Sequence, residues 1–173
     1  MNISREEFEK HFTDFQREAF RLETLDDYSG SSNPAYLRAF MAGEPQPPNY
    51  NQEWVDDVRA NAQAGKRMYR VHILSRPLTD YLRFELGWGY AKNAEAGEEF
   101  FILDTTERPN PLAGVPDFWM FDESSVVSMN YGENGKFHDA ESRSDVSRWI
   151  EYRDVALANS VPLQEWWERF GAE

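Results

Sequence analysis

Cysteine is absent from the 173 residues of this chain. Disulfide bonds, thiolate metal sites and cysteine nucleophiles are therefore excluded. The first residues, Met1-Asn2-Ile3-Ser4-Arg5-Glu6-Glu7, lack the basic and apolar regions of a secretory signal. No apolar run approaches the roughly 20 residues that cross a bilayer. From these absences we expect a soluble cytoplasmic protein.

Positive charge is also scarce, because 18 Lys and Arg stand against 31 Asp and Glu, for a formal net charge of −13. Duplex DNA and anionic membranes repel such a chain, so we expect no direct binding to nucleic acid or membrane. A basic partner protein fits the charge, as does an acidic antitoxin-like or DNA-mimic role. The acidic residues are scattered without a run of five like charges, which weakly disfavours mimicry.

Aromatic residues, in contrast, make up 15% of the chain, enough to build the core of one domain spanning 1–173. The proline-rich connector 44–50 would separate a helical N-terminal part, 1–45, from an α/β core with C-terminal helices, 51–173. A capping box at Ser4 and Glu7 precedes a helix expected at 4–19. Further helices are expected after Asn33 and Asn51, and at 145–158 and 162–170.

Runs of β-branched and aromatic residues predict strands at 67–75, 99–103, 117–121, 126–131 and 136–141, with 20–25 a short extended segment. A helix at 78–90 separates the first two strands, which should therefore be parallel with a right-handed crossover. Asn134-Gly135 predicts a hairpin between the last two. The expected fold class is α+β or α/β. A mixed sheet of about five strands, strand-helix-strand and then an antiparallel meander, would carry the N- and C-terminal helices on it.

Polar and aromatic side chains crowd the corner between strand 67–75 and helix 78–90. Such corners are where α/β proteins usually place a ligand or partner. The aromatic segment 117–122, bracketed by carboxylates, would complete the same face. A structural interpretation competes, in which Thr79 or Asp80 caps the helix and Tyr81 belongs to the core. The predicted binding residues are Arg76, Thr79, Asp80, Tyr81, Arg83, Glu85, Asp117 and Trp119.

No complete catalytic motif accompanies these residues. His11, His72 and His138 show no ligand spacing, and no Gly-x-Ser-x-Gly elbow is present. Asp117 and Asp122 would point to opposite faces of a regular strand, which argues against a shared metal site. We therefore predict no catalytic residue, no metal ligand and no cofactor.

A series of short motifs occurs in order along nearly the whole chain: Phe20-Arg21-Leu22-Glu23-Thr24, Gly43-Glu44-Pro45, Pro77–Glu85, Ala96-Gly97-Glu98 and Asp117–Asp122. Together they resemble an actinobacterial family classed as a domain of unknown function. Members of that family are often encoded beside, or fused to, helix-turn-helix regulators. The resemblance implies a regulatory or partner-binding role, and it transfers no catalytic residue.

The order strand-helix-strand-strand, with Gly97-Glu98 and Phe121-Asp122, is also similar to half of a phospholipase-D-type domain. That superfamily needs a His-x-Lys pair followed by Asp. The matching region here reads Asp117-Phe118-Trp119. A shared fold would therefore come without the phosphodiesterase chemistry.

The sequence thus predicts a non-catalytic cytoplasmic regulatory module. It would bind a small polar ligand, or a partner such as a helix-turn-helix regulator or another basic protein. One alternative is a hydrolase-like enzyme on a degenerate phosphodiesterase-type scaffold, which would use Asp80, Tyr81 and Glu85 or the strand 117–122. The other alternative is the acidic antitoxin-like or DNA-mimic protein. The shortage of acid/base pairs favours the binding module over the enzyme.

Overall fold

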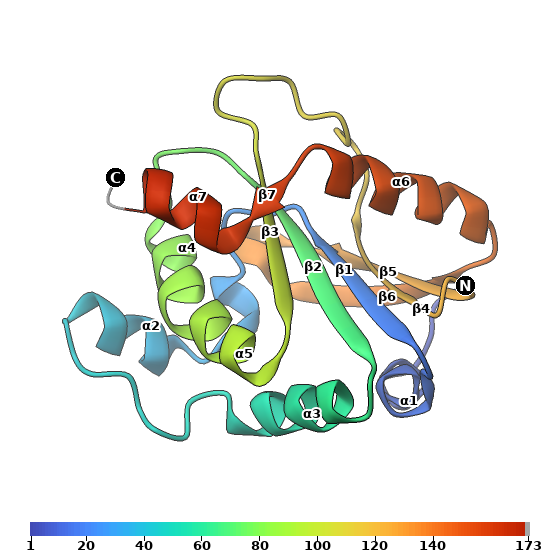
Figure 1. Cartoon of the computed structure of the whole chain (residues 1–173), viewed down its shortest axis with the longest axis horizontal. Helices are drawn as coiled ribbons and strands as arrows, with labels where there is room; N and C mark the ends of the chain where they lie inside the picture. The colour runs from blue at the N-terminus through green and yellow to red at the C-terminus, as the bar shows by residue number, and fades with distance from the viewer. Residues whose placement is uncertain (172–173) are drawn as a thin grey trace.

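A seven-stranded mixed sheet runs through the middle of the protein in the computed structural model, which describes residues 1–171 (Figure 1). Its strands are β1 Glu18–Glu23, β2 Arg67–Leu74, β3 Glu99–Asp104, β4 Asp117–Phe121, β5 Ser125–Tyr131, β6 Phe137–Arg143 and β7 Val161–Pro162. They lie in the order β6-β5-β4-β1-β2-β3-β7. β1, β2 and β3 are parallel to one another, whereas all other neighbouring pairs are antiparallel.

Helices pack on both faces of this sheet. They are α1 Arg5–Asp14, α2 Pro34–Met41, α3 Gln52–Gln63, α4 Asp80–Phe84, α5 Ala91–Ala96, α6 Val146–Ala158 and α7 Leu163–Phe170. A π-helical turn, η2 Glu85–Tyr90, joins α4 and α5 into one helical stretch, and short 3₁₀ turns occupy η1 Ser29–Ser31 and η3 Glu133–Gly135. Within residues 1–171, the structure contains no helix that is both long and apolar enough to cross a membrane.

The predicted topology is confirmed in outline. β2, the helical stretch 80–96 and β3 form the parallel strand-helix-strand unit, and β4, β5 and β6 form the antiparallel meander. The prediction of about five strands was too low, because β1 and β7 also belong to the sheet. β1 was expected only as an extended segment, since its buried Arg21 and Glu23 hide the apolar character of a central strand. β7 is too short to show any periodicity.

Local sequence signals predicted some helix ends correctly and others incorrectly. Ser4 and Glu7 form the predicted capping box of α1. The predicted helix 4–19 was too long, because α1 ends at Asp14 and Ala19 lies in β1. Ala19 packs in the same cluster as the apolar residues of α1, although it belongs to β1. Its match to the helical spacing is therefore a coincidence. Asn51 precedes α3 with a left-handed backbone (φ 56°), and its side chain makes no cap hydrogen bond.

The two faces of the sheet bury different kinds of side chain. α6 covers one face, where Phe20, Phe118 and Trp149 belong to an apolar core. Figure 1 shows α1 and α3 on the opposite side of the strands from α6. That second face is apolar near α1, where Met68 and Phe121 pack with the helix. It becomes charged towards the carboxyl ends of β1 and β2.

The charged end of the second face follows from the two-residue period of strands. Arg21 and Glu23 on β1 alternate with the apolar residues of the first face, as do Arg70 and His72 on β2 and Asp117 on β4. The parallel register places Arg21 beside Arg70 and Glu23 beside His72. A helical crossover therefore has to cover a charged surface, which the stretch 80–96 does.

Candidate functional site

Two arginines and their carboxylate partners form a buried ion-pair network on the second face of the sheet. Arg21 Nη2 lies 2.9 Å from Asp117 Oδ2. Arg70 lies between Glu23 and Glu98, with nitrogen–oxygen distances of 2.8 and 2.7 Å. Burial alone would lower the pKa of the Arg70 guanidinium, but the two carboxylates outweigh it and hold that pKa well above its usual range. The ion pairs offset the free-energy cost of burying these guanidinium groups, because an unpaired charge is very costly to bury.

Asp117 is held in place on several sides. Tyr28 donates from its hydroxyl to Oδ2 at 2.5 Å, and Thr24 donates to Oδ1 from its backbone nitrogen at 3.0 Å. Tyr131 accepts a hydrogen bond from Arg21 at 3.0 Å and so extends the same network. With these bonds Asp117 supports the site from beneath the surface, since it is only 2% exposed.

Beside this network, the side chains of His72, Glu85 and Tyr90 gather around Glu23 at the end of β1 and β2. His72 Nδ1 lies 3.9 Å from Glu23 Oε2 and 4.0 Å from Glu85 Oε2. The Tyr90 hydroxyl is 2.9 Å from His72 Nδ1 and donates to Glu23 Oε1. His72 Nε2 is 2.7 Å from the carbonyl oxygen of Leu25, which can only accept, so this nitrogen carries a hydrogen.

Glu85 is the least satisfied member of the cluster. Its Oε2 atom is buried and has no hydrogen-bond partner among residues 1–171. Burial and the neighbouring Glu23 carboxylate raise the pKa of Glu85 well above its usual range. Burial also opposes ionisation of Glu23, but Arg70 outweighs it, so the pKa of Glu23 is lowered. The two adjacent carboxyl groups therefore differ in acidity, and Glu85 keeps its proton to a higher pH than Glu23 does.

The π-helical turn presents Glu85 to a cavity. Tyr81, Glu85, Gly89 and Asn93 follow one another at intervals of four residues and line one wall of a pocket of about 350 Å³. Single π-helical turns within α-helices frequently occur at functional sites. We call this cavity the aromatic pocket. Its lining is Phe12, Ser32, Tyr50, Asn51, Trp54, Arg70, Tyr81, Phe84, Glu85, Gly89, Tyr90, Asn93 and Trp119.

Aromatic rings make the opposite wall of the aromatic pocket. Trp54 of α3 and Trp119 of β4 are tilted against each other with centroids 5.9 Å apart. Trp54 Nε1 donates to Glu98 at 2.9 Å, which ties the wall to the ion-pair network. Tyr50 adds a hydroxyl whose pKa is raised to about 12 by burial and by Glu85. The pocket can therefore accept a flat apolar group above a charged floor.

The structure brings together half of the residues predicted for a binding face. Tyr81, Glu85 and Trp119 line the aromatic pocket, and Asp117 pairs with Arg21, whose guanidinium lies 5.8 Å from the ring centroid of Trp119. Thr79 caps α4, because its hydroxyl accepts from Leu82 N at 3.2 Å and donates to the Asp26 carbonyl at 2.6 Å. This is the structural role that competed with binding in the sequence-based interpretation.

The other predicted residues lie elsewhere. Arg76 pairs with Asp104 at 2.7 Å, and its guanidinium lies 3.8 Å from the ring centroid of Phe170 on α7. Asp80 and Arg83 form an exposed pair at 3.5 Å. Helical geometry explains the split, because positions 80 and 83 share a face that positions 81 and 85 do not.

Sequence reasoning missed several members of the site: Glu23, Trp54, Arg70, His72, Tyr90, Asn93 and Glu98. One signal was present in the sequence. Ionisable residues stand two apart at Arg21 and Glu23 and again at Arg70 and His72, although both segments are otherwise apolar and lie in the sheet. Ionisable residues two apart in each of two central strands indicate a polar site on one face.

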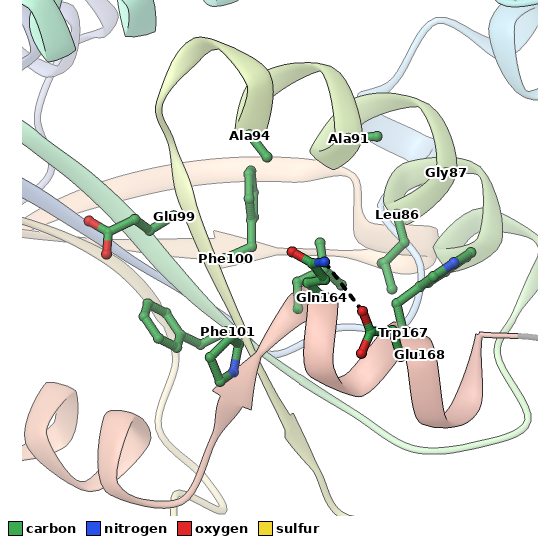
Figure 2. Close-up of a pocket in the computed structure, with 12 residues that line it drawn as sticks. Leu86, Gly87, Ala91, Ala94, Glu99, Phe100, Phe101, Gln164, Trp167 and Glu168 are labelled. Atoms are coloured by element: carbon green, nitrogen blue, oxygen red, sulfur yellow. Dashed lines mark hydrogen bonds between the residues drawn. The ribbon is translucent and has the colours of Figure 1, made fainter.

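A larger apolar groove of about 680 Å³ lies on another side of the helical stretch 80–96 (Figure 2). Leu86 and Gly87 of η2 line it together with Phe100 of β3. Figure 2 shows Trp167 extending from α7 towards the turn that carries Leu86 and Gly87. Its indole is 39% exposed. Carboxylates border this groove at Glu99 and Glu168, and no basic side chain lines it within residues 1–171.

Comparison with known proteins gives one family. The model of a domain of unknown function (DUF6879) matches residues 6–168. That range includes the aromatic pocket, the ion-pair network and the apolar groove. The search of curated proteins found no match to the chain.

Proposed function

The chain belongs to the DUF6879 family of domains of unknown function, and from this starting point we propose that it is a non-catalytic regulatory module that binds a small ligand in the aromatic pocket. One observation carries the proposal: a cavity of about 350 Å³ with aromatic walls opens onto buried Arg70 and Glu85. Small-molecule sites are typically concave, mostly apolar and supplied with a few convergent polar groups. We also propose a cytoplasmic location.

The lining suggests the chemistry of the ligand. Trp54 and Trp119 contribute indole surface to the lining, which suits a flat apolar group. Glu85 and Asn93 offer hydrogen-bonding atoms on the facing helix. The ligand would therefore have a planar body and a polar head that reaches Glu85. A nucleobase or an aromatic acid or amine has this form.

Binding is favoured over the hydrolase-like alternative by the placement of the residues. That enzyme would use either Asp80 together with Tyr81 and Glu85 or the strand 117–122, and the first set is divided in the structure. Asp80 pairs with Arg83 at the surface, whereas Tyr81 and Glu85 line the pocket. The remaining charged groups of the floor are held in ion pairs that a ligand would have to break before they could react.

The apolar groove is the surface that we propose for a partner protein. A segment with an apolar face and basic flanks fits it, because Glu99 and Glu168 border the groove and the chain carries a net charge of −13. A helix-turn-helix regulator is the partner implied by the family resemblance. The mimicry alternative would use scattered surface charge instead of this groove.

The π-helical turn would couple ligand binding in the aromatic pocket to partner binding in the apolar groove. Glu85 and Gly89 face the aromatic pocket, while Leu86 and Gly87 of the same turn line the groove. A ligand that favours one arrangement of this turn would change the affinity for the partner by the same factor as the partner changes ligand affinity. A ligand that binds both arrangements equally would have no regulatory effect.

A matched pair of glycine substitutions tests the ligand pocket. A Cβ at Gly89 would lie 3.9 Å from Glu85 Cγ and from the Tyr50 hydroxyl, so Gly89→Ala fits sterically but narrows the cavity. A Cβ at Gly87 would lie 3.6 Å from Phe40, outside the pocket lining. Both changes replace glycine in the same turn, so Gly87→Ala controls for altered helix propensity.

The measurement is a thermal-shift screen of nucleobases, aromatic acids and aromatic amines, followed by titration of tryptophan fluorescence, all in EDTA. We expect at least one compound to bind the unchanged protein. Its affinity should fall about tenfold in Gly89→Ala, equivalent to ~1.4 kcal/mol, and stay unchanged in Gly87→Ala. Equal losses in the two variants, or no binding by any compound, would contradict the proposal.

A further inference from the structure

We propose that Glu23, His72 and Glu85 form a binding site for one divalent first-row metal ion, such as Mn²⁺, Fe²⁺ or Zn²⁺. The site lies next to the aromatic pocket, whose lining includes Glu85. The inference goes beyond the proposed function, because the ion needs no organic ligand for binding. Neither the family nor the sequence pattern assigns a metal to this chain.

The geometry of the three donors suits one ion. His72 Nδ1 and the facing oxygens of Glu23 and Glu85 all lie within 4.8 Å of one another. The two measured nitrogen–oxygen separations are 3.9 and 4.0 Å. Bonds of about 2.0–2.2 Å to nitrogen and oxygen put two donors on one ion at most ~4.4 Å apart. An ion between the three donors therefore needs only small side-chain shifts.

The hydrogen bonds of His72 present the correct nitrogen. Because Nε2 donates to the Leu25 carbonyl, Nδ1 can offer its lone pair towards Glu23 and Glu85. A backbone carbonyl on the second ring nitrogen is the usual support of a metal-bound histidine. The ion would replace the contact between Nδ1 and the Tyr90 hydroxyl. Tyr90 would keep its hydrogen bond to Glu23 Oε1.

Glu23 is also held in the orientation that a ligand requires. Arg70 and Tyr90 both bind its Oε1 atom, which leaves Oε2 directed at His72. Hydrogen-bonded carboxylates of this kind commonly orient metal ligands. Glu85 supplies the second oxygen from the pocket side, so water or a bound molecule could complete the coordination from the cavity.

An unsatisfied oxygen and an excess of carboxyl groups over guanidinium groups favour the binding of a cation. Glu85 Oε2 is buried without a hydrogen-bond partner in the described part of the chain, residues 1–171. The network contains the carboxyl groups of Glu23, Glu85, Glu98 and Asp117 but only the guanidinium groups of Arg21 and Arg70. An ion that binds Glu85 displaces any proton on this carboxyl group to solvent, and its double charge then balances the two carboxylates that exceed the guanidinium groups.

The test uses the full chain after EDTA treatment and dialysis, titrated with MnCl₂ and with ZnCl₂ in an isothermal calorimeter. We expect one ion per chain. Glu85→Gln should weaken affinity at least about tenfold, because the amide is a neutral and poorer ligand. Glu95→Gln is the matched control, since Glu95 is exposed on the same helical stretch. It should bind as the unchanged protein does.

A second readout identifies the histidine without mutating a fully buried residue. Pulsed electron paramagnetic resonance of the Mn²⁺ complex should show modulation from one directly bound imidazole nitrogen. Circular dichroism checks that Glu85→Gln remains folded. No binding, several ions per chain with equal weakening in Glu95→Gln, or no nitrogen modulation would each overturn the metal site. The ligand screen runs in EDTA, so its outcome is separate from this one.

Discussion

Arg21 on β1 and Asp117 on β4 form a buried ion pair across adjacent antiparallel strands, with 2.9 Å between Nη2 and Oδ2. Their strands are paired so that Arg21 lies opposite Trp119, and the contact therefore runs diagonally over two positions. The pair links two neighbouring strands of the sheet, and its Arg21 lies beside Trp119, which lines the aromatic pocket. Its integrity should matter for stability as well as for the site.

Asp117→Ala should destabilise the protein by about 3–5 kcal/mol, because it leaves the Arg21 guanidinium buried without its partner. Tyr28 and Thr24 would lose an acceptor in the same step. Urea denaturation measures the change. Asp80→Ala is the control, since its exposed pair with Arg83 should contribute less than ~1 kcal/mol. Similar losses in the two variants would contradict the assignment of Asp117 to a buried network.

Gly135→Ala should be severely destabilising, because a Cβ there would lie 2.2 Å from the Asp27 carbonyl oxygen and 2.6 Å from Tyr28 Cα. The residue also has a φ of 66°, which disfavours any side chain. Gly43→Ala is the matched control. It has a φ of 72° but open space around its Cβ, so it should cost only about 1 kcal/mol. Thermal unfolding of the two variants separates steric overlap from backbone strain, and equal melting temperatures would refute the close approach.

Asp122 should make stability depend on pH. Burial opposes its ionisation, but the backbone N–H groups of Gln16, Glu18 and Arg17 outweigh this and lower the pKa of Asp122. A carboxyl group with a lowered folded-state pKa stabilises the protein above its unfolded pKa of about 3.9 and loses that contribution as pH falls through the folded value.

Asp122→Asn should therefore lower stability by about 1 kcal/mol at pH 7, a value reduced for partial exposure. The difference from the unchanged protein should shrink as the pH falls below about 4. Denaturant unfolding between pH 7 and pH 3 measures it. A difference that stays constant with pH would show that the carboxylate charge has no part in holding the start of β1.

Arg76→Ala should loosen α7 instead of impairing ligand binding. Arg76 pairs with Asp104 Oδ2, which also accepts a hydrogen bond from Trp166 Nε1 at 2.9 Å, and its guanidinium lies over the ring of Phe170. Hydrogen exchange should speed up in 163–170, while the affinity of the aromatic pocket stays unchanged. Arg83→Ala should leave both properties unaltered, because Arg83 is exposed. If Arg76→Ala lost ligand affinity, Arg76 would belong to the binding face, as the sequence predicted.

The local elements could be predicted because their signals lie within a few residues of one another. The capping box at Ser4 and Glu7 and the left-handed turn at Asn134-Gly135 depend on neighbouring backbone groups. The strand-helix-strand unit and the meander followed from the order of these elements. The apolar content of β2 to β5 was also readable, because most of their residues are buried.

The site could be predicted only in part. Glu85 and Tyr81 were identified because they belong to one crowded corner, but the same corner holds Asp80 and Arg83, which helical rotation turns outward. Glu23 was overlooked because charged residues obscure the central position of β1.

Local sequence therefore specified most of the segments that become helix or strand, since these depend on short-range sterics and periodicity. The meeting of Glu23, His72 and Glu85 came from the tertiary structure alone. Parallel pairing of β1 with β2 sets the first two side by side, and the packing of the π-helical turn over them adds the third. Such pairings bring together residues distant in sequence, and their stability comes from burial across the whole sheet, which no single segment encodes.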